Sequence, residues 1–173
     1  MLKIVRLWKN RRKPLTEVCE VESSEPRISA ELVEKIILNH FGYRPFWFWK
    51  YLLTDARIYI GDPWYNPVTE EDLETICNTC REVFQNIKYI PTIFDCDDFT
   101  RVLIGQVSLL RYRHRKNYAF GYVWVLLNID GEEYGHATCF YINDRLEFRW
   151  YEPQLCKTFN FDKYSPKLIL CVI

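Results

Sequence analysis

Apolar residues recur with helical spacing in three segments of the chain. Ser29 stands at an N-cap position before the first, and Gly42 closes it. Thr69 stands at the same position before the second, ahead of acidic residues 70–72 that suit a helix N-terminus. The third helix is expected to begin at Cys96. The inward residues are Leu32, Val33, Ile36, Ile37 and Phe41, then Leu73, Ile76, Cys77, Cys80, Phe84 and Ile87, then Phe99, Val102, Leu103, Val107 and Leu110.

After the third helix the apolar period changes to two, which is typical of strands. Asp130-Gly131 is a hairpin signal, and Asn143-Asp144 marks a second turn. The strands are expected over residues 119–128, 133–142 and 146–152, with shorter strands at 3–8 and 57–60. Helices followed by an antiparallel β-meander predict the α+β class.

The length of 173 residues is near that of one domain and is enough to bury a core. We therefore expect a single domain over 1–173. Residues 1–90 would form a mainly helical half with short strands, and 91–155 the third helix and the β-meander core. The aromatic run Phe46–Leu53 is expected to be a buried connector.

The charges balance, with 23 Lys and Arg against 23 Asp and Glu, so they point to no nucleic-acid or membrane partner. No signal-peptide h-region and no apolar run of about 18 residues is present. The seven cysteines are odd in number and irregularly spaced, which favours reduced thiols. We expect a soluble cytoplasmic or otherwise intracellular protein, with a viral origin left open and an oligomeric state that the sequence does not define.

Cys96 is the first candidate for chemistry, in the segment Phe94-Asp95-Cys96-Asp97-Asp98-Phe99. The unsatisfied N–H groups of a helix start favour a thiolate, and the backbone N–H of Cys96 could stabilise an oxyanion. The alternative is a small residue that merely begins a helix.

Three carboxylates surround this thiol, and together they would disfavour a thiolate by like-charge repulsion. An imidazolium partner or a hard cation would offset them, and calcium takes clustered carboxylate oxygens. Asp95, Asp97 and Asp98 are therefore candidate calcium ligands. A solvated acidic helix cap is the alternative.

His136 and Glu152 complete the candidate set. His136 lies in a predicted strand between Gly135 and Ala137, and Glu152 ends the next strand before Pro153. A carboxylate there could hold the imidazole in the useful tautomer, although a strand histidine can also be purely structural. A two-residue turn at 143–144 would turn Glu152 away from His136, whereas a three-residue loop or a bulge would pair them directly. We predict the longer loop or a bulge.

The three motifs Asp-Cys-Asp-Asp-Phe, Gly-His-Ala and Glu-Pro-Gln, in this order over residues 89–155, resemble the papain-like cysteine peptidase domain of fungal chimerolectins of the fairy-ring-mushroom agglutinin type and its bacterial and viral relatives. The resemblance implies a papain-like fold and a calcium-dependent thiol peptidase. It also implies Cys96 as nucleophile, His136 as base and Glu152 as orienting carboxylate, acting on a peptide or protein substrate.

The leading hypothesis is therefore a papain-like cysteine hydrolase with a Cys-His-Glu triad. Trp150 and Gln154, beside Glu152, are candidates for its substrate groove. The rival is a non-enzymatic viral, structural or binding module that keeps the fold. Other signals have simpler explanations: the Cys77–Cys80 pair and Cys139 as core residues, and the basic stretches 11–13 and 111–116 as solvated ends.

Overall fold

A seven-stranded sheet lies at the centre of the computed structural model, which describes residues 3–6, 25–42 and 57–173. The strand order is β1-β3-β9-β5-β6-β7-β8, and a two-stranded sheet pairs β2 with β4. The helices of the described residues are α1 (Ala30–His40), α3 (Glu70–Phe84) and α4 (Cys96–His114). The strands are β1 (Lys3–Arg6), β2 (Ile28–Ser29), β3 (Arg57–Ile60), β4 (Trp64–Tyr65), β5 (Phe120–Ile129), β6 (Glu132–Ile142), β7 (Phe148–Glu152), β8 (Lys157–Thr158) and β9 (Lys167–Val172). Two 3-10 turns, η2 (Pro153–Leu155) and η3 (Asp162–Tyr164), flank β8.

The antiparallel meander expected from the sequence is present as β5-β6-β7, with β8 added at the edge. Asp130 and Gly131 both have positive φ, at 55° and 92°, as a tight two-residue hairpin turn requires. The other side of the sheet differs. The C-terminal β9 runs antiparallel to β5 but parallel to β3, and β3 is parallel to β1. The mixed class and the mostly antiparallel sheet are therefore as expected, whereas the parallel side was not foreseen.

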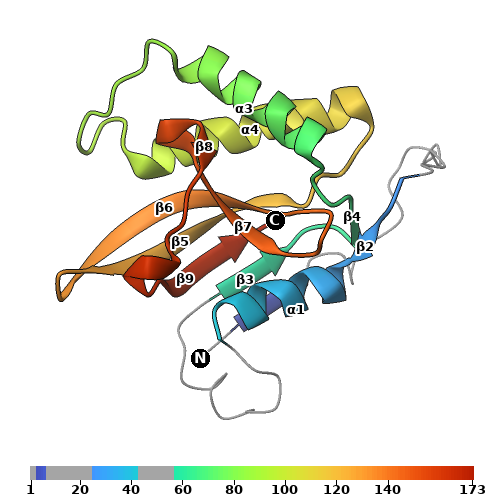
Figure 1. The fold of residues 1–173 in the computed structure, drawn as a ribbon, viewed down its shortest axis with the longest axis horizontal. Coiled ribbons are helices and arrows are strands. Elements are labelled where there is room, and N and C mark those ends of the chain that lie inside the picture. Colours follow the sequence, from blue (N-terminus) through green and yellow to red (C-terminus); the bar gives the residue numbers. More distant parts are fainter. Residues whose placement is uncertain (1–2, 7–24, 43–56) are drawn as a thin grey trace.

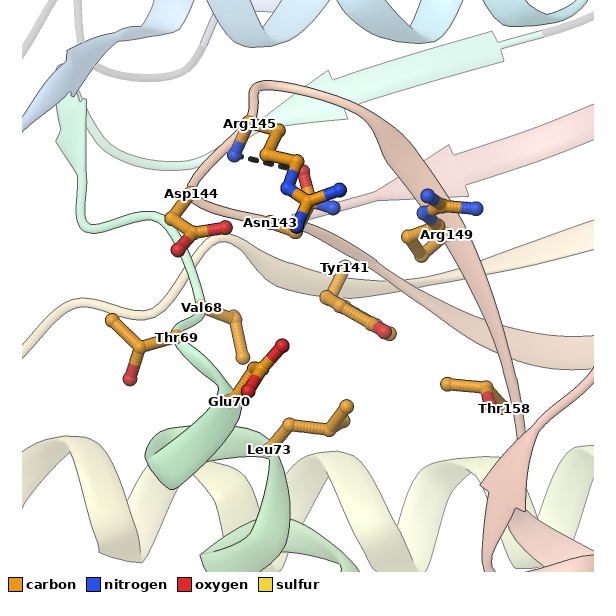
Figure 2. A pocket seen from close by; sticks show the side chains of 10 residues that line it. All are labelled: Val68, Thr69, Glu70, Leu73, Tyr141, Asn143, Asp144, Arg145, Arg149 and Thr158. Atoms are coloured by element: carbon orange, nitrogen blue, oxygen red, sulfur yellow. Dashed lines mark hydrogen bonds between the residues drawn. The ribbon is translucent and has the colours of Figure 1, made fainter.

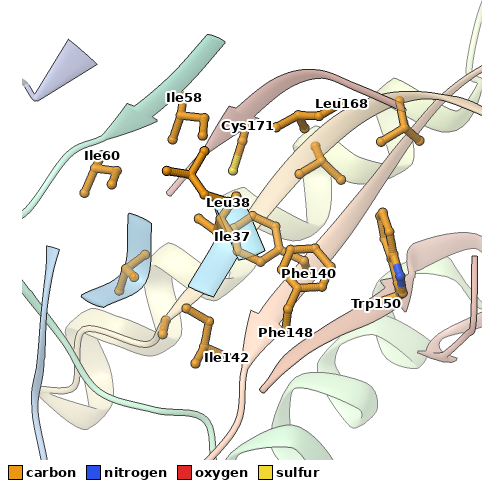
Figure 3. Close-up of a cluster of buried hydrophobic side chains, with 14 of the residues drawn as sticks. Ile37, Leu38, Ile58, Ile60, Phe140, Ile142, Phe148, Trp150, Leu168 and Cys171 are labelled. Carbon is orange, nitrogen blue, oxygen red and sulfur yellow. The ribbon is translucent and has the colours of Figure 1, made fainter. Parts of the chain in front are cut away.

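The helices cover both faces of the sheet (Figure 1). Helix α1 packs on one face, where Ile37, Ile58, Phe140 and Trp150 belong to one buried cluster (Figure 3). Helices α3 and α4 cover the other face, where Ile76 and Leu103 meet strand residues such as Tyr151. The sheet is thus buried on both sides, which explains why the strand sequences are almost continuously apolar.

All three helices begin where their sequence signals place them. The Ser29 hydroxyl accepts a hydrogen bond from the Leu32 N–H at 3.3 Å. Thr69 with Asp72, and Asp95 with Asp98, form complete capping boxes at the starts of α3 and α4. Each box satisfies N–H groups that the helix itself cannot pair.

The loop between β6 and β7 is longer than predicted. Cys139 pairs with Tyr151 and Ile142 with Phe148, so residues 143–147 form the connection. The direct pairing of His136 with Glu152 was therefore wrong, and Glu152 lies opposite Thr138 in the extended register. Because this shift is two residues, His136 and Glu152 still project from the same face.

Three expectations fall wholly or partly outside the described residues: the Phe46–Leu53 connector, the solvated basic stretch 11–13, and the last two residues of the first strand, 7–8. Across the described parts of the chain, no helix combines the length and apolarity needed to cross a membrane. The six cysteines within those parts are all free thiols.

Candidate functional site

Cys96 is the first residue of α4, directly after the N-cap Asp95. Its side chain is partly buried, and its backbone N–H has no acceptor within the helix because it belongs to the first turn. The Cys96 sulfur accepts a hydrogen bond from the Ala137 N–H at 3.5 Å. The start of α4 is thereby held against strand β6.

This contact is possible because β7 leaves β6 at Cys139, the last paired residue. From Thr138 back toward the start of β6, the edge that faced β7 has no neighbouring strand among the described residues. The start of α4 lies beside this edge instead. The open edge brings His136, next to Ala137, to the thiol at the helix start. His136 also forms a side-chain hydrogen bond with Cys96.

Glu152 anchors the other side of the imidazole. Its Oε2 lies 2.8 Å from His136 Nε2 and accepts a hydrogen bond from the Thr138 hydroxyl at 3.4 Å. Its Oε1 accepts from the Gln154 N–H at 3.0 Å, which caps η2. Because Nε2 faces the carboxylate, Nδ1 is the ring nitrogen left for Cys96. The structure therefore brings Cys96, His136 and Glu152 together in one hydrogen-bonded chain.

The imidazole is strongly biased toward its charged form. Burial lowers the pKa of His136, but the hydrogen bonds with Cys96 and Glu152 and their negative charges outweigh it and raise the pKa to about 9. The His136 and Glu152 side chains are 18% and 6% exposed, respectively. At neutral pH the site therefore holds an imidazolium that is largely shielded from water.

A recess of about 220 Å³ opens at the thiol. Cys96, His136, Asp95 and Asp97 line it on one part, and Gly135 and the apolar side chains of Trp124, Val125, Ala137 and Ile169 line the rest. Trp124 and Ile169 are 39% and 37% exposed, so part of each apolar side chain faces solvent beside the thiol. Between Trp124 and Val125 the pairing of β5 with β9 shifts, so Ile169 is an extra residue at an irregularity of the sheet. These two side chains form apolar walls beside the reactive groups.

The three acidic residues near Cys96 do converge. One oxygen from each of Asp95, Asp97 and Asp98 lies within 4.8 Å of the others. However, Asp95 and Asp98 act in the capping box, and Arg101 forms ion pairs with Asp97 and Asp98. A hydrogen bond between the side chains of Asp95 and Asp97 lowers the pKa of Asp95 and raises that of Asp97. These contacts explain why the three carboxylates converge without a bound ion, and calcium binding by them stays a prediction.

The candidate groove residues do not join the site. Trp150 is 4% exposed and belongs to the core beside α1, where its indole N–H donates to Asp162 at 2.8 Å. Gln154 lines a different recess, with Phe84 and Phe99. The residues that do line the Cys96 recess, Trp124 and Ile169, were missed. Trp124 could have been found, since it pairs with Ala137 in the hairpin that Asp130-Gly131 predicts.

Other thiols differ from Cys96. Cys80, Cys139 and Cys171 are fully buried, and burial raises the pKa of each. The core roles expected of Cys80 and Cys139 agree with this burial. Arg111, expected at a solvated end, instead donates to the carbonyl oxygens of Tyr118 and Phe120 at 2.8 and 2.7 Å.

Comparison with known proteins gives structural neighbours only. No family model matches the chain, and no curated protein matches it. Among solved structures, the one titled "PSL1a-E64 complex" matches with a TM-score of 0.61 at 17% identity, covering 85% of this chain and 51% of the other. A lectin of Polyporus squamosus, bound to the epitope Neu5Aca2-6Galb1-4GlcNAc, matches with a TM-score of 0.57 at 18% identity, covering 85% and 49%. The chain thus spans about half the length of these proteins, and the likeness shows the fold alone.

These comparisons correct the assignment made from sequence. The two structures reported above share the fold and are those of a lectin, and no family model matches the chain. The identification as a papain-like cysteine peptidase of the chimerolectin type was therefore wrong, as were the calcium-dependent hydrolase function and the thiol-protease and catalytic-triad descriptions. What the structure shows is a mixed fold of helices and a mostly antiparallel sheet, in which a thiol, an imidazole and a carboxylate meet beside an apolar recess.

Proposed function

We propose that this chain is a binding module and that its ligand enters the recess at Cys96. The observation that carries the proposal is the hydrogen-bonded chain of Cys96, His136 and Glu152, because Cys96 and His136 line a recess with apolar walls and Glu152 lies buried behind His136. Recesses that combine apolar walls with a few convergent polar groups are typical ligand sites. The finer description of the fold as papain-like stays a prediction.

Within this proposal the three residues keep distinct roles in holding a ligand. Cys96 is the nucleophile, His136 the base and Glu152 the group that orients His136. A ligand carbonyl would be captured reversibly by the thiolate–imidazolium pair: a bond forms from the Cys96 sulfur to the carbonyl carbon, and the carbonyl oxygen takes the proton from His136, which leaves a neutral imidazole. The Cys96 N–H, which has no helical acceptor, is placed to stabilise that oxygen.

The walls define the preferred ligand. Trp124 and Ile169 offer apolar surface next to the thiol, so a carbonyl compound with an apolar substituent fits better than a fully polar one. The structural neighbours supply two further probes, because their titles name E64 and the trisaccharide Neu5Aca2-6Galb1-4GlcNAc as bound compounds. If either compound bound, this chain would share a ligand with a structural neighbour.

The test is thiol labelling of the full chain with iodoacetamide, mapped by mass spectrometry. The variants are Cys96→Ser, His136→Ala and Glu152→Gln. Cys77 and Cys156, which are also partly buried, serve as internal control thiols. We expect Cys96 to react at least about tenfold faster than the controls near neutral pH and to lose this advantage in His136→Ala. A carbonyl ligand or E64 that occupies the recess should protect Cys96 but not Cys77.

Two results would overturn the proposal. Equal reactivity of Cys96 and the control thiols would show that the site does not activate the sulfur. Release of a cleaved product from a peptide or ester, dependent on Cys96, would show that the module does more than bind.

A further inference from the structure

A second recess, separate from Cys96, lies between the start of α3, the 143–147 loop and β8 (Figure 2). Its volume is about 320 Å³, and both polar and apolar side chains line it. Val68 and Leu73 contribute apolar surface, and Glu70 points into the space from the first residue of α3. None of the residues proposed above for ligand capture takes part.

Tyr141 contributes a hydroxyl to this recess, and the surrounding core holds its ring in place. The residue is only 6% exposed, and its ring stacks on Phe120 at 6.5 Å between centroids. Its hydroxyl points into the recess and has no hydrogen-bond partner among the described residues (Figure 2). Because this hydroxyl lines the open recess, it is available to hydrogen-bond a ligand hydroxyl.

The charges around Tyr141 are of both signs. Arg145 and Arg149 come from the loop and β7, while Glu70 and Asp144 supply carboxylates. Arg149 pairs with Glu147, whereas Arg145, Glu70 and Asp144 have no ion pair within the described ranges. A simple anion would meet two carboxylates here, and a simple cation would meet two guanidinium groups. Neutral hydroxyl groups suit the lining, because each can donate to a carboxylate and accept from a guanidinium.

The loop that carries Arg145 is rigidly built. The Asn143 side-chain oxygen accepts hydrogen bonds from the N–H groups of Arg145 and Glu147 at 3.1 and 2.9 Å. The Asn143 amide donates to the Glu147 carboxylate at 3.0 Å. The backbone that carries Arg145 is therefore fixed before a ligand arrives, which reduces the entropy that the loop loses on binding.

We infer that this recess binds a neutral sugar. The Tyr141 hydroxyl, Glu70 and the arginines would contact the sugar hydroxyls, and Leu73 would pack against an apolar face of the ring. This inference is independent of the capture proposed at Cys96.

Saturation-transfer NMR tests it on the full chain, with the methyl glycosides of glucose, galactose, mannose and N-acetylglucosamine at millimolar concentrations. Tyr141→Phe removes one oxygen and Glu70→Gln removes one charge. The matched controls are Tyr112→Phe, at an exposed position, and Glu74→Gln, one turn further along α3. We expect at least one glycoside to bind, and Tyr141→Phe to weaken it about fivefold, the effect of one lost hydrogen bond.

Binding should be unchanged in the two controls and in Cys96→Ser. Three results would overturn the inference: no transfer to any glycoside, equal binding by Tyr141→Phe and wild type, or loss of binding in Cys96→Ser, which would place the sugar in the other recess. Binding of inorganic phosphate without any glycoside would mark the recess as an anion site instead.

Discussion

His136 is the residue on which the chemistry of the candidate site depends. Its ring lies between a thiol and a carboxylate, and its centroid is 5.1 Å from that of Phe161. The charged partners overcome the effect of burial, which by itself would favour the neutral ring. The protonation of this one ring can therefore be shifted by changing either neighbour, and both changes are measurable.

Glu152→Gln should lower the pKa of His136 from about 9 toward its ordinary value of 6.5. The amide keeps an acceptor for His136 Nε2 but removes the negative charge that stabilises the imidazolium. An NMR titration of the imidazole C–H signals of wild type and variant measures this directly. Glu147→Gln, which changes an exposed carboxylate on the 143–147 loop, is the control and should leave the titration unchanged. An unaltered His136 titration in Glu152→Gln would contradict the assigned partner.

The same ring should make stability depend on pH. Because the folded pKa of about 9 lies above the ordinary 6.5, the stabilisation is complete below pH 6.5 and is lost as pH rises toward 9. The loss should reach about 3 kcal/mol at most. Urea unfolding of wild type and His136→Gln at several pH values between 6 and 10 isolates this contribution. The buried cysteines also titrate on unfolding, but they do so in both proteins and cancel in the difference.

At the scale of elements, the sequence predicted what local chemistry specifies. Ser29, Thr69 and Asp95 cap helices at the expected positions, and Asp130-Gly131 forms the hairpin turn. His136 and Glu152 were expected on one face, and they remain there although the 143–147 loop is longer, since adding two residues preserves the face. The walls of the recess were missed because Ile169 reaches it through β9. A strand pairing between β5 and β9, some forty residues apart, leaves no local signal.

Gly121→Ala should destabilise the sheet. A Cβ at this position would collide with the Val172 carbonyl oxygen and would lie 2.8 Å from the Phe140 ring. Overpacking of this kind costs about 1–3 kcal/mol. Gly135→Ala in β6 is the matched control, because a Cβ there meets nothing within 4 Å. Equal free energies of unfolding for the two variants would show that β5 and β9 are not packed as closely as the structure indicates.

At the scale of the whole molecule, one sheet separates two buried clusters. Helix α1 packs on one face, and α3 with α4 on the other. Adjacent residues of β6 alternate between the two, with Phe140 in the first cluster and Cys139 and Tyr141 in the second. The same strands therefore carry both layers, and on this basis a single cooperative domain stays a prediction.

The two layers should consequently unfold together. Ile37→Ala in α1 and Leu103→Ala in α4 each remove a fully buried side chain, one from each cluster. Each should cost about 2–5 kcal/mol, the usual effect of such a cavity. Both should shift one transition in calorimetry, with the calorimetric enthalpy equal to the van't Hoff enthalpy. Leu109→Ala, at a half-exposed position of α4, should shift it much less. A second transition in either core variant would show that the faces of the sheet fold independently, and the chain would then have to be treated as two cooperative units that share a sheet.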